Sequence, residues 1–204
     1  MIQQGEIDTR APALVLVKGH PGSGKTSVAR GLARRLLWPV VDKDDARGPL
    51  HTSDFGGVSQ SRLNELSYQV MFRIVKTQLE CGLSVIVDCP FARKELFNEA
   101  KELAEKSGAR IVILECEARD EEIWKSRLEE RATQDETSPE SHKPQNWQAL
   151  RALIESYREC WRWSDTVDND VALRRVIDTT AQEDLETIIH HIIQDLKETG
   201  VLTG

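Results

Sequence analysis

Residues 19–26 read Gly-His-Pro-Gly-Ser-Gly-Lys-Thr and form a complete G-x-x-x-x-G-K-[ST] pattern. The apolar run before it, Ala13–Lys18, is typical of a buried strand, and Val28, Leu32 and Leu36 follow it at helical spacing. A glycine-rich turn between a strand and a helix points successive backbone N–H groups at an anion, at the positive end of the helix dipole. The sequence therefore predicts a phosphate-binding loop.

Each position of this loop has an expected task. Gly22 and Gly24 allow the backbone to bend. We expect Lys25 to contact the β- and γ-phosphates of a nucleotide, and the Thr26 hydroxyl to ligate Mg²⁺. The Asn-Lys-x-Asp signature of guanine-specific proteins is absent, which favours ATP as the nucleotide. The residues predicted to bind it here are Gly22, Ser23, Gly24, Lys25, Thr26 and Ser27.

Short β-type runs alternate with helical segments along the rest of the chain. Several of the runs are almost continuous Val, Ile and Leu, as in strands that are covered on both faces. The strand–helix alternation predicts an α/β fold with an open parallel sheet and right-handed crossovers. Besides Ala13–Lys18, the expected strands are Trp38–Asp42, Leu83–Asp88, Arg110–Cys116 and Val171–Ile177.

Apolar spacing predicts which helix faces are buried. A long helix shows the stripe Leu63, Leu66, Val70 and Ile74, and Gly82 stands where the helix should end. Gly108 closes a second helical pattern in the same way. The last helix repeats Leu185, Ile188, Ile189, Ile192 and Leu196, and Thr180 with Glu183 is spaced as a capping box at its start.

Two polar segments, residues 43–58 and 132–146, interrupt this alternation. Each is longer than an ordinary connection. Long segments of this kind are often lids or substrate loops, and the alternative is a tolerated surface insertion.

Length and charge limit the classes of protein that fit. The 204 residues suit one domain, with residues 1–12 as an N-terminal tail. The chain has 27 Lys and Arg against 34 Asp and Glu, a net charge of −7, which disfavours a protein that coats nucleic acid. No apolar run approaches the ~20 residues of a membrane span. The N-terminus does not resemble a secretory signal, and the four cysteines form no CxxC pair, so we expect a cytoplasmic protein.

Carboxylates follow two of the expected strands. Asp88 ends an apolar strand as in a Walker B motif and could hold Mg²⁺ or its bound water. The second run continues into Asp42-Lys43-Asp44-Asp45-Ala46-Arg47. An acid here can accept the proton of an attacking hydroxyl, while Arg47 binds an acceptor group or the transferring phosphoryl. The alternatives are a turn-capping Asp88 and a solvated acidic turn with Arg47 as counter-ion.

Residues 120–131 predict a helix with the buried stripe Ile123, Trp124 and Leu128. Arg127 and Arg131 are four apart and share one face. Together with the polar segment that follows, they predict a lid over about residues 119–163 whose arginines stabilise charge on a transferring phosphoryl group. The alternative is an ordinary charged helix face.

Other residues around this lid have simpler interpretations. Lys143 could join the lid, although a single Lys in a polar loop is usually only solvated. His20 lies inside the phosphate-binding loop and is interpreted as part of the loop rather than as a catalyst. Trp161 and Trp163 predict core packing in preference to base stacking.

Together these motifs resemble the small P-loop kinases, a group that includes polynucleotide 5′-hydroxyl kinases, gluconate kinases, chloramphenicol phosphotransferases and zeta toxins. The resemblance implies a three-layer P-loop NTPase fold, with five parallel strands in the order second, third, first, fourth, fifth and a helical lid insertion. It also implies Asp44 as the general base, Arg47 at the reacting phosphate, Arg127 or Arg131 as the lid arginine, and an approach of the nucleotide base to Asp178-Thr179-Thr180.

The expected function is transfer of the γ-phosphate of ATP, with Mg²⁺, to a hydroxyl group of a small molecule. The chain is acidic and shows no track of basic and aromatic residues, so a polynucleotide 5′-hydroxyl acceptor is possible but not favoured. A nucleotide-dependent switch or an ATPase without an acceptor is the alternative from another class. The pattern specifies neither the acceptor nor the oligomeric state.

Overall fold

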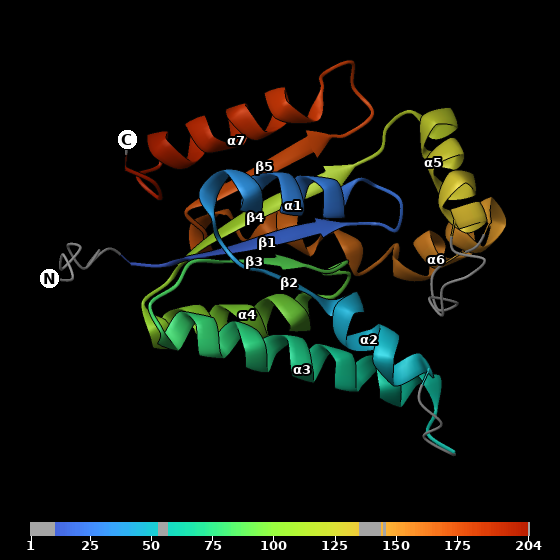
Figure 1. Cartoon of the computed structure of the whole chain (residues 1–204), viewed down its shortest axis with the longest axis horizontal. Coiled ribbons are helices and arrows are strands. Elements are labelled where there is room, and N and C mark those ends of the chain that lie inside the picture. The colour runs from blue at the N-terminus through green and yellow to red at the C-terminus, as the bar shows by residue number, and fades with distance from the viewer. Residues whose placement is uncertain (1–10, 53–56, 135–143, 145, 204) are drawn as a thin grey trace, which may run out of the picture.

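A computed structural model describes residues 11–52, 57–134, 144 and 146–203 (Figure 1). At its centre lies a five-stranded parallel sheet in the order β2-β3-β1-β4-β5, which confirms the expected fold and strand order. The strands are β1 (Ala13–Gly19), β2 (Val40–Asp42), β3 (Val85–Asp88), β4 (Arg110–Glu117) and β5 (Leu173–Asp178).

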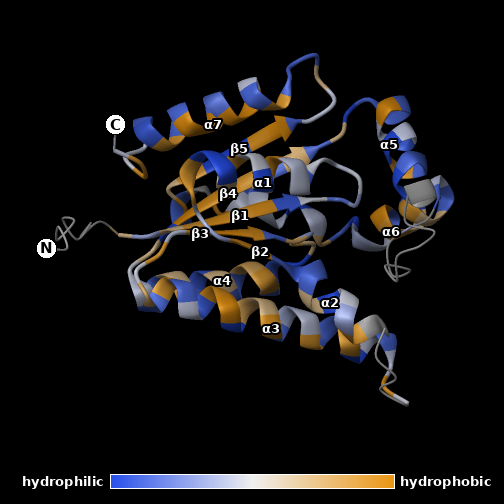
Figure 2. Cartoon of the chain, in the orientation of Figure 1, coloured by the Kyte–Doolittle hydropathy of each residue, from blue (hydrophilic) through white to orange (hydrophobic). Residues whose placement is uncertain are grey.

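Helices cover both faces of this sheet (Figure 1). On one side α1 (Lys25–Leu36) and α7 (Leu185–Glu198) enclose an apolar cluster with β1, β4 and β5. On the other, α3 (Gln60–Glu80) and α4 (Lys94–Ser107) enclose a second cluster. Figure 2 shows the apolar strands between these two helical layers. Strands covered on both faces must be apolar along their whole length, which explains the near-continuous Val, Ile and Leu runs.

The strand register gathers the predicted site at one edge of the sheet. Asp42 at the end of β2 lies beside Asp88 at the end of β3, and Val17 of β1 lies beside Asp88 on its other side. The phosphate-binding loop leaves β1 at the same edge. Because all strands are parallel, their carboxyl ends and the loops that follow them meet there.

Residues 43–52 correct one prediction: they form helix α2 (Lys43–Thr52) rather than a loop, and Pro49 lies inside it. The Asp42 carboxylate accepts a hydrogen bond of 2.8 Å from the Asp44 backbone N–H, so it satisfies a donor of the first turn. Asp44 and Asp45 also lie in that turn, where the helix dipole favours negative charge. Residues 53–56 of the predicted loop lie outside the described residues.

The buried face of α3 also differs from the prediction. Leu63 is buried, but Val70 and Ile74 are 40% and 43% exposed. The helix instead buries Ser67, Met71, Val75 and Leu79, which repeat at the same spacing on a neighbouring face. Both stripes satisfy the helical period, so only packing against the sheet distinguishes them.

Helix ends were predicted with mixed success. Gly82 and Gly108 adopt φ of +75° and +67° at the ends of α3 and α4, as expected. The capping box before α7 was wrong, because the side chain of Asp184 caps the helix by accepting from Thr187 N at 2.8 Å. Thr180 accepts instead from the backbone N–H groups of residues 119 and 120.

The predicted lid, about residues 119–163, contains α5 (Glu121–Gln134), α6 (Trp147–Tyr157) and the start of the 3₁₀ segment η2 (Trp161–Thr166). A second 3₁₀ segment, η3 (Asp168–Asp170), lies beyond it. On α5, Leu128 is fully buried, whereas Ile123 is 40% exposed and does not belong to the buried stripe. Lys143 lies outside the described residues, as do residues 1–10 of the predicted tail. The bounds of the lid remain a prediction.

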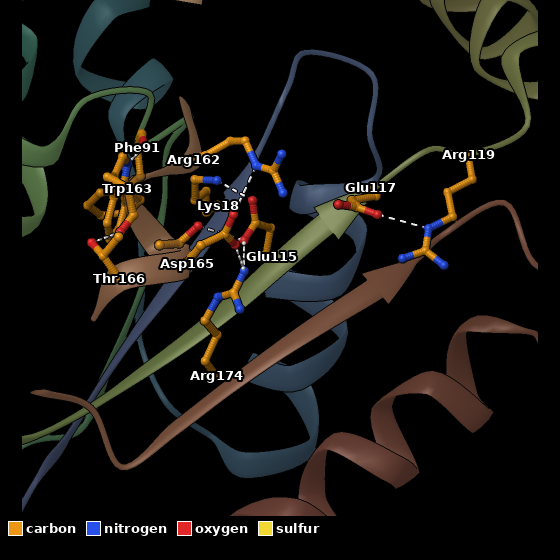
Figure 3. A network of polar contacts seen from close by, with 11 residues as sticks. Lys18, Phe91, Glu115, Glu117, Arg119, Arg162, Trp163, Asp165, Thr166 and Arg174 are labelled. Atoms are coloured by element: carbon orange, nitrogen blue, oxygen red, sulfur yellow. Dashed lines mark hydrogen bonds and ion pairs between the residues drawn. The ribbon is translucent and has the colours of Figure 1, made fainter. Parts of the chain in front are cut away.

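A network of buried charges ties η2 to the sheet (Figure 3). Lys18 of β1 and Glu115 of β4 are register neighbours, both buried, and form an ion pair. Burial lowers the pKa of Lys18, and the Glu115 carboxylate opposes that shift. Glu115 also accepts from Ser164 Oγ of η2 at 2.8 Å and from Arg174 at 3.2 Å. Glu115 is therefore the shared acceptor of this network.

Glu115→Ala should lower the free energy of unfolding by about 3–5 kcal/mol, because it leaves the buried Lys18 ammonium without its carboxylate. Urea unfolding followed by circular dichroism measures this. Glu65→Ala, which removes one partner of an exposed pair with Arg62, is the control and should change stability little. A loss at Glu115 no larger than at Glu65 would contradict a structural role for the network.

Candidate active site

A cavity of about 720 Å³ opens at the carboxyl edge of the sheet. Its walls come from the phosphate-binding loop, the ends of β2 and β3, and helices α2, α3, α5 and α6. Most of the predicted site residues line this cavity, although they lie far apart in the sequence. They are Gly22, Gly24, Lys25, Thr26, Ser27, Asp44, Arg47, Asp88 and Arg131. Of the other predicted residues, Arg127 and Thr179 line a second cavity of about 440 Å³, which shares Gly22, Gly24 and Ser27 with the first.

The phosphate-binding loop has the backbone that the motif predicts. Gly22 and Gly24 adopt φ of +77° and +81°, a region that side chains rarely adopt. A Cβ at Gly22 would lie 2.9 Å from the Trp124 indole nitrogen, and one at Gly24 would lie 3.0 Å from Thr179. Lys25 Nζ donates to the His20 carbonyl at 3.1 Å. The loop is therefore closely packed by α5 and the β5–α7 turn.

Two carboxylates, Asp42 and Asp88, lie beside each other on the cavity wall. Burial, with the neighbouring Asp88 carboxylate, raises the pKa of Asp42 to about 7. Asp88 is 2% exposed, and its Oδ2 has no hydrogen-bond partner in the described part of the chain. Thr26 lines the same cavity. Mg²⁺ prefers oxygen ligands, keeps several waters and commonly binds through one or two carboxylates, so this set suits it. Sequence reasoning did not include Asp42 in the site.

The acidic run after β2 divides between the cavity and the solvent. Asp44 lines the cavity, and its carboxylate pairs with Lys43 Nζ at 2.9 Å. Asp45 is exposed and does not line the cavity. Arg47 is 2% exposed and reaches the same cavity from the next turn of α2.

The two lid arginines occupy different places. Arg131 lines the main cavity, and its Nη2 donates to the Pro144 carbonyl at 3.1 Å. Arg127 lines the second cavity, where it donates to Thr179 Oγ1 at 3.1 Å and to the Thr179 carbonyl at 2.7 Å. They lie on one helix, yet only Arg131 faces the space shared by Lys25 and Asp44.

Two aromatic side chains contact the phosphate-binding loop. Trp124 Nε1 donates to the Pro21 carbonyl at 2.9 Å, and Trp161 stacks on His20 with ring centroids 3.5 Å apart. Burial, with Lys18 and Lys25 nearby, lowers the pKa of His20 to about 3, so it is neutral and does not titrate near pH 7. The core-packing prediction is correct for Trp163, which is 6% exposed, and wrong for Trp161, which lines the cavity.

One polar face of the cavity was missed by sequence reasoning. Helix α3 presents Gln60, Asn64 and Tyr68 to it, at intervals of four residues. The regular spacing of these polar groups along one side of the first half of α3 is the signal that could have identified them.

The four cysteines are free, and burial raises the pKa of Cys89 at the end of β3. Across the described ranges, no helix has the length and apolar character to cross a membrane.

A protein-family profile described as AAA domain matches residues 14–156. The chain belongs to this family. The match includes the phosphate-binding loop, both strand-end carboxylates and the two arginines of α5, so it covers the residues that line the main cavity except Tyr157 and Trp161.

Several solved structures share the fold of this AAA domain. A sugar kinase from Janibacter sp. HTCC2649 superposes with a TM-score of 0.61 at 19% identity, over 95% of this chain and 99% of that one. A gluconokinase from Sinorhizobium meliloti 1021 gives 0.57 at 17%, over 93% and 94%. The Mycobacterium tuberculosis APS kinase CysC, in complex with AMPPNP and APS, gives 0.56 at 18%, over 92% and 98%. At these identities the likeness shows the fold.

Among curated proteins, an uncharacterized protein of Mycobacterium tuberculosis (strain ATCC 25618 / H37Rv) is 33% identical over 114 residues. The match covers 52% of this AAA domain and 23% of that protein. The chain thus spans about a quarter of the length of the curated relatives it matches.

Proposed function

We propose that this AAA domain is an ATP- and Mg²⁺-dependent kinase that transfers the γ-phosphate of ATP to a hydroxyl group of a small molecule. The observation that carries this proposal is one cavity that joins the phosphate-binding loop to a carboxylate, Asp44, and to the polar face of α3. A nucleotide switch needs the phosphate-binding loop. It does not need a polar wall beside a carboxylate that can act as a general base.

The phosphate end of the cavity supplies binding and electrostatic stabilisation. The loop amides and Lys25 hold the phosphates, as the strand–loop–helix arrangement allows. Thr26 and Asp88, with Asp42 beside them, would hold Mg²⁺, which supplies neutralisation of charge on the β- and γ-phosphate oxygens. On the other side of the loop, Thr179 and Arg127 border a cavity with apolar Val28, Leu185 and Ile188, which suits a nucleobase.

The acceptor end supplies proton transfer and closure. Asp44 faces the cavity, so its carboxylate can accept the proton of the acceptor hydroxyl as that oxygen attacks. Arg131 faces the same space and stabilises charge on the transferring phosphoryl oxygens. Of the two lid arginines, we therefore assign Arg131 to catalysis and Arg127 to nucleotide binding.

Size and charge favour a small acceptor over a polynucleotide. The cavity of about 720 Å³ has the volume of a small-ligand site and must also admit the phosphates of ATP. The chain carries a net charge of −7, which opposes a strand of phosphates. The sugar kinase and gluconokinase structures, which share the fold, agree with a small polyhydroxylated acceptor.

A screen of metabolites for ATP consumption above the rate without acceptor tests the function. We expect one class of small hydroxyl compounds to raise ADP release and to yield a phosphorylated product by mass spectrometry. A parallel arm offers 5′-hydroxyl oligonucleotides, for which we expect weak, salt-insensitive binding. Tight, steeply salt-dependent binding with 5′-phosphorylation would replace the small-molecule acceptor with a polynucleotide. ATP hydrolysis that no acceptor stimulates would favour a switch.

Replacing the two lid arginines should separate their roles. Arg131→Ala should lower kcat by about 10²-fold, since the lost contact stabilises charge that develops in the transition state. Arg127→Ala should mainly raise the KM for ATP, because this side chain is hydrogen-bonded to Thr179 on the nucleotide side. Steady-state kinetics with varied ATP measures both. Equal, small effects in both variants would make α5 an ordinary surface helix.

A further inference from the structure

We propose that the acceptor carries an anionic group besides the hydroxyl that is phosphorylated, and that Arg47 binds this group. The inference rests on the proposed kinase function and names the chemical class of its acceptor: a small hydroxy acid or a phosphorylated polyol.

The first observation is the state of the Arg47 guanidinium. The residue is 2% exposed, its Nη2 donates to the uncharged Gln60 Oε1, and its Nη1 has no hydrogen-bond partner among the residues that the structure describes. Within the described ranges, no carboxylate forms an ion pair with it. A buried cation with an unsatisfied donor is costly unless a ligand satisfies it. Because Arg47 lines the cavity, that ligand can reach it from there.

Comparison with the other buried cations of the chain strengthens this point. Lys18 is fully buried and pairs with Glu115. Lys43 is 6% exposed and pairs with Asp44 at 2.9 Å. Both therefore have an internal carboxylate, whereas Arg47, one turn beyond Lys43 on α2, has an amide. The fold thus leaves a planar, five-donor cation available to a carboxylate or phosphate, the groups that arginine binds in bidentate fashion.

The second observation is the distance available. Asp44 and Arg47 are three residues apart on α2, which is about 4.5 Å along the helix axis. A hydroxyl at Asp44 and an anion at Arg47 therefore fit on one small molecule of a few carbons. Gln60 and Asn64 of α3 line the same wall and offer hydrogen bonds to further hydroxyls.

A different task for Arg47 would be contact with the transferring phosphoryl group, as the resemblance to small P-loop kinases implies. The two tasks differ in one measurable respect. An arginine on the phosphoryl group serves every acceptor equally, whereas an arginine on the acceptor's anion serves only acceptors that carry one.

The experiment compares matched acceptors with and without charge: D-gluconate with D-sorbitol, D-glycerate with glycerol, and sn-glycerol 3-phosphate with glycerol. For the parent, kcat/KM should be higher for the anionic member of at least one pair. Arg47→Gln should lower that value on the order of 10²-fold, as when one partner of a buried charge pair is removed. It should leave the neutral member almost unchanged. Arg73→Gln, an exposed arginine on α3, makes the same change in net charge and should preserve the preference.

A second variant guards against a folding defect at position 47. Gln60→Glu keeps the size of the side chain and places a carboxylate on the Arg47 guanidinium, so it should satisfy the arginine internally and repel the anion. We expect this variant to fold and to lose the preference for the anionic acceptor.

Binding is measured separately by the thermal shift that each anionic compound causes with Mg²⁺–AMPPNP saturating the phosphate-binding loop. A thermal shift that depends on the anion, and that Arg47→Gln and Gln60→Glu both remove, supports the proposed anion site. If that shift is seen but no compound is phosphorylated, the proposed kinase function is wrong and the anion site still stands. Equal use of charged and neutral acceptors overturns the proposal and leaves the kinase function standing. An equal loss on both kinds of acceptor assigns Arg47 to the phosphoryl group, and absence of any Arg47-dependent shift or preference also overturns the proposal.

Discussion

Lys25→Ala should abolish phosphoryl transfer, with a loss on the order of 10³ or more in kcat/KM, comparable to loss of an arginine finger. The ammonium lies at the phosphate-binding loop, where it donates to the His20 carbonyl, and an alanine leaves the phosphates without their cation. The fold should survive, because Lys25 is the first residue of α1 and does not belong to either apolar cluster.

Isothermal titration with ATP and Mg²⁺, beside an ADP-release assay, measures this loss. Arg30→Ala on the exposed side of the same helix is the matched control and should keep both activities. Turnover of ATP by the folded Lys25 variant at the parent rate would show that the loop is not the phosphate site.

Asp44→Asn should leave ATP binding nearly normal and lower acceptor phosphorylation by about 10²–10⁴-fold, the range typical of a general base. The substitution keeps the shape of the side chain and removes its basicity. Asp44 lines the cavity from α2 and is not part of the loop that would hold the phosphates, so we expect its charge to contribute little to nucleotide affinity. Asp45→Asn should be much milder, because Asp45 is exposed and outside the cavity wall.

Product formation with an identified acceptor, beside ATP titration of each variant, decides between the carboxylates. Full transfer by Asp44→Asn with loss in Asp45→Asn would move the base by one residue. Asp42→Asn is the third arm, since the pKa of Asp42 is raised to about 7 by burial and by Asp88. We expect this variant to need more Mg²⁺ for the same rate. If Asp42→Asn abolishes transfer, Asp44→Asn does not, and ATP and Mg²⁺ still bind normally, then Asp42 rather than Asp44 is the general base.

Much of the fold could be predicted because its signals are local. The phosphate-binding loop depends on glycines at positions of positive φ, and no other residue type meets that requirement easily. Strands covered on both faces are apolar throughout, so β1, β3 and β4 were visible as runs of Val, Ile and Leu. Gly82 and Gly108 end their helices for the same backbone reason.

Errors arose where two arrangements satisfy the same local rule. The stripe containing Val70 and Ile74 and the stripe containing Met71 and Val75 both repeat at the helical period, and the sheet selects the second. Polar composition suggested a loop after β2. The segment forms helix α2 instead, because the Asp42 carboxylate accepts from a backbone N–H of the first turn and the helix dipole favours the acids there. This helix places Asp44 and Arg47 on the cavity wall.

The sequence by itself determined the phosphate-binding loop, the parallel α/β sheet and the acids at the strand ends, because glycine conformation, strand burial and chain order are properties of short segments. Only the tertiary structure decided that Asp42 lies against Asp88, that Arg131 and Arg127 line different cavities, and that α3 forms part of the wall of the main cavity. It alone showed that Arg47 is buried beside an amide instead of a carboxylate. These relations join segments far apart in the chain, and packing, which no single segment encodes, brings them into contact.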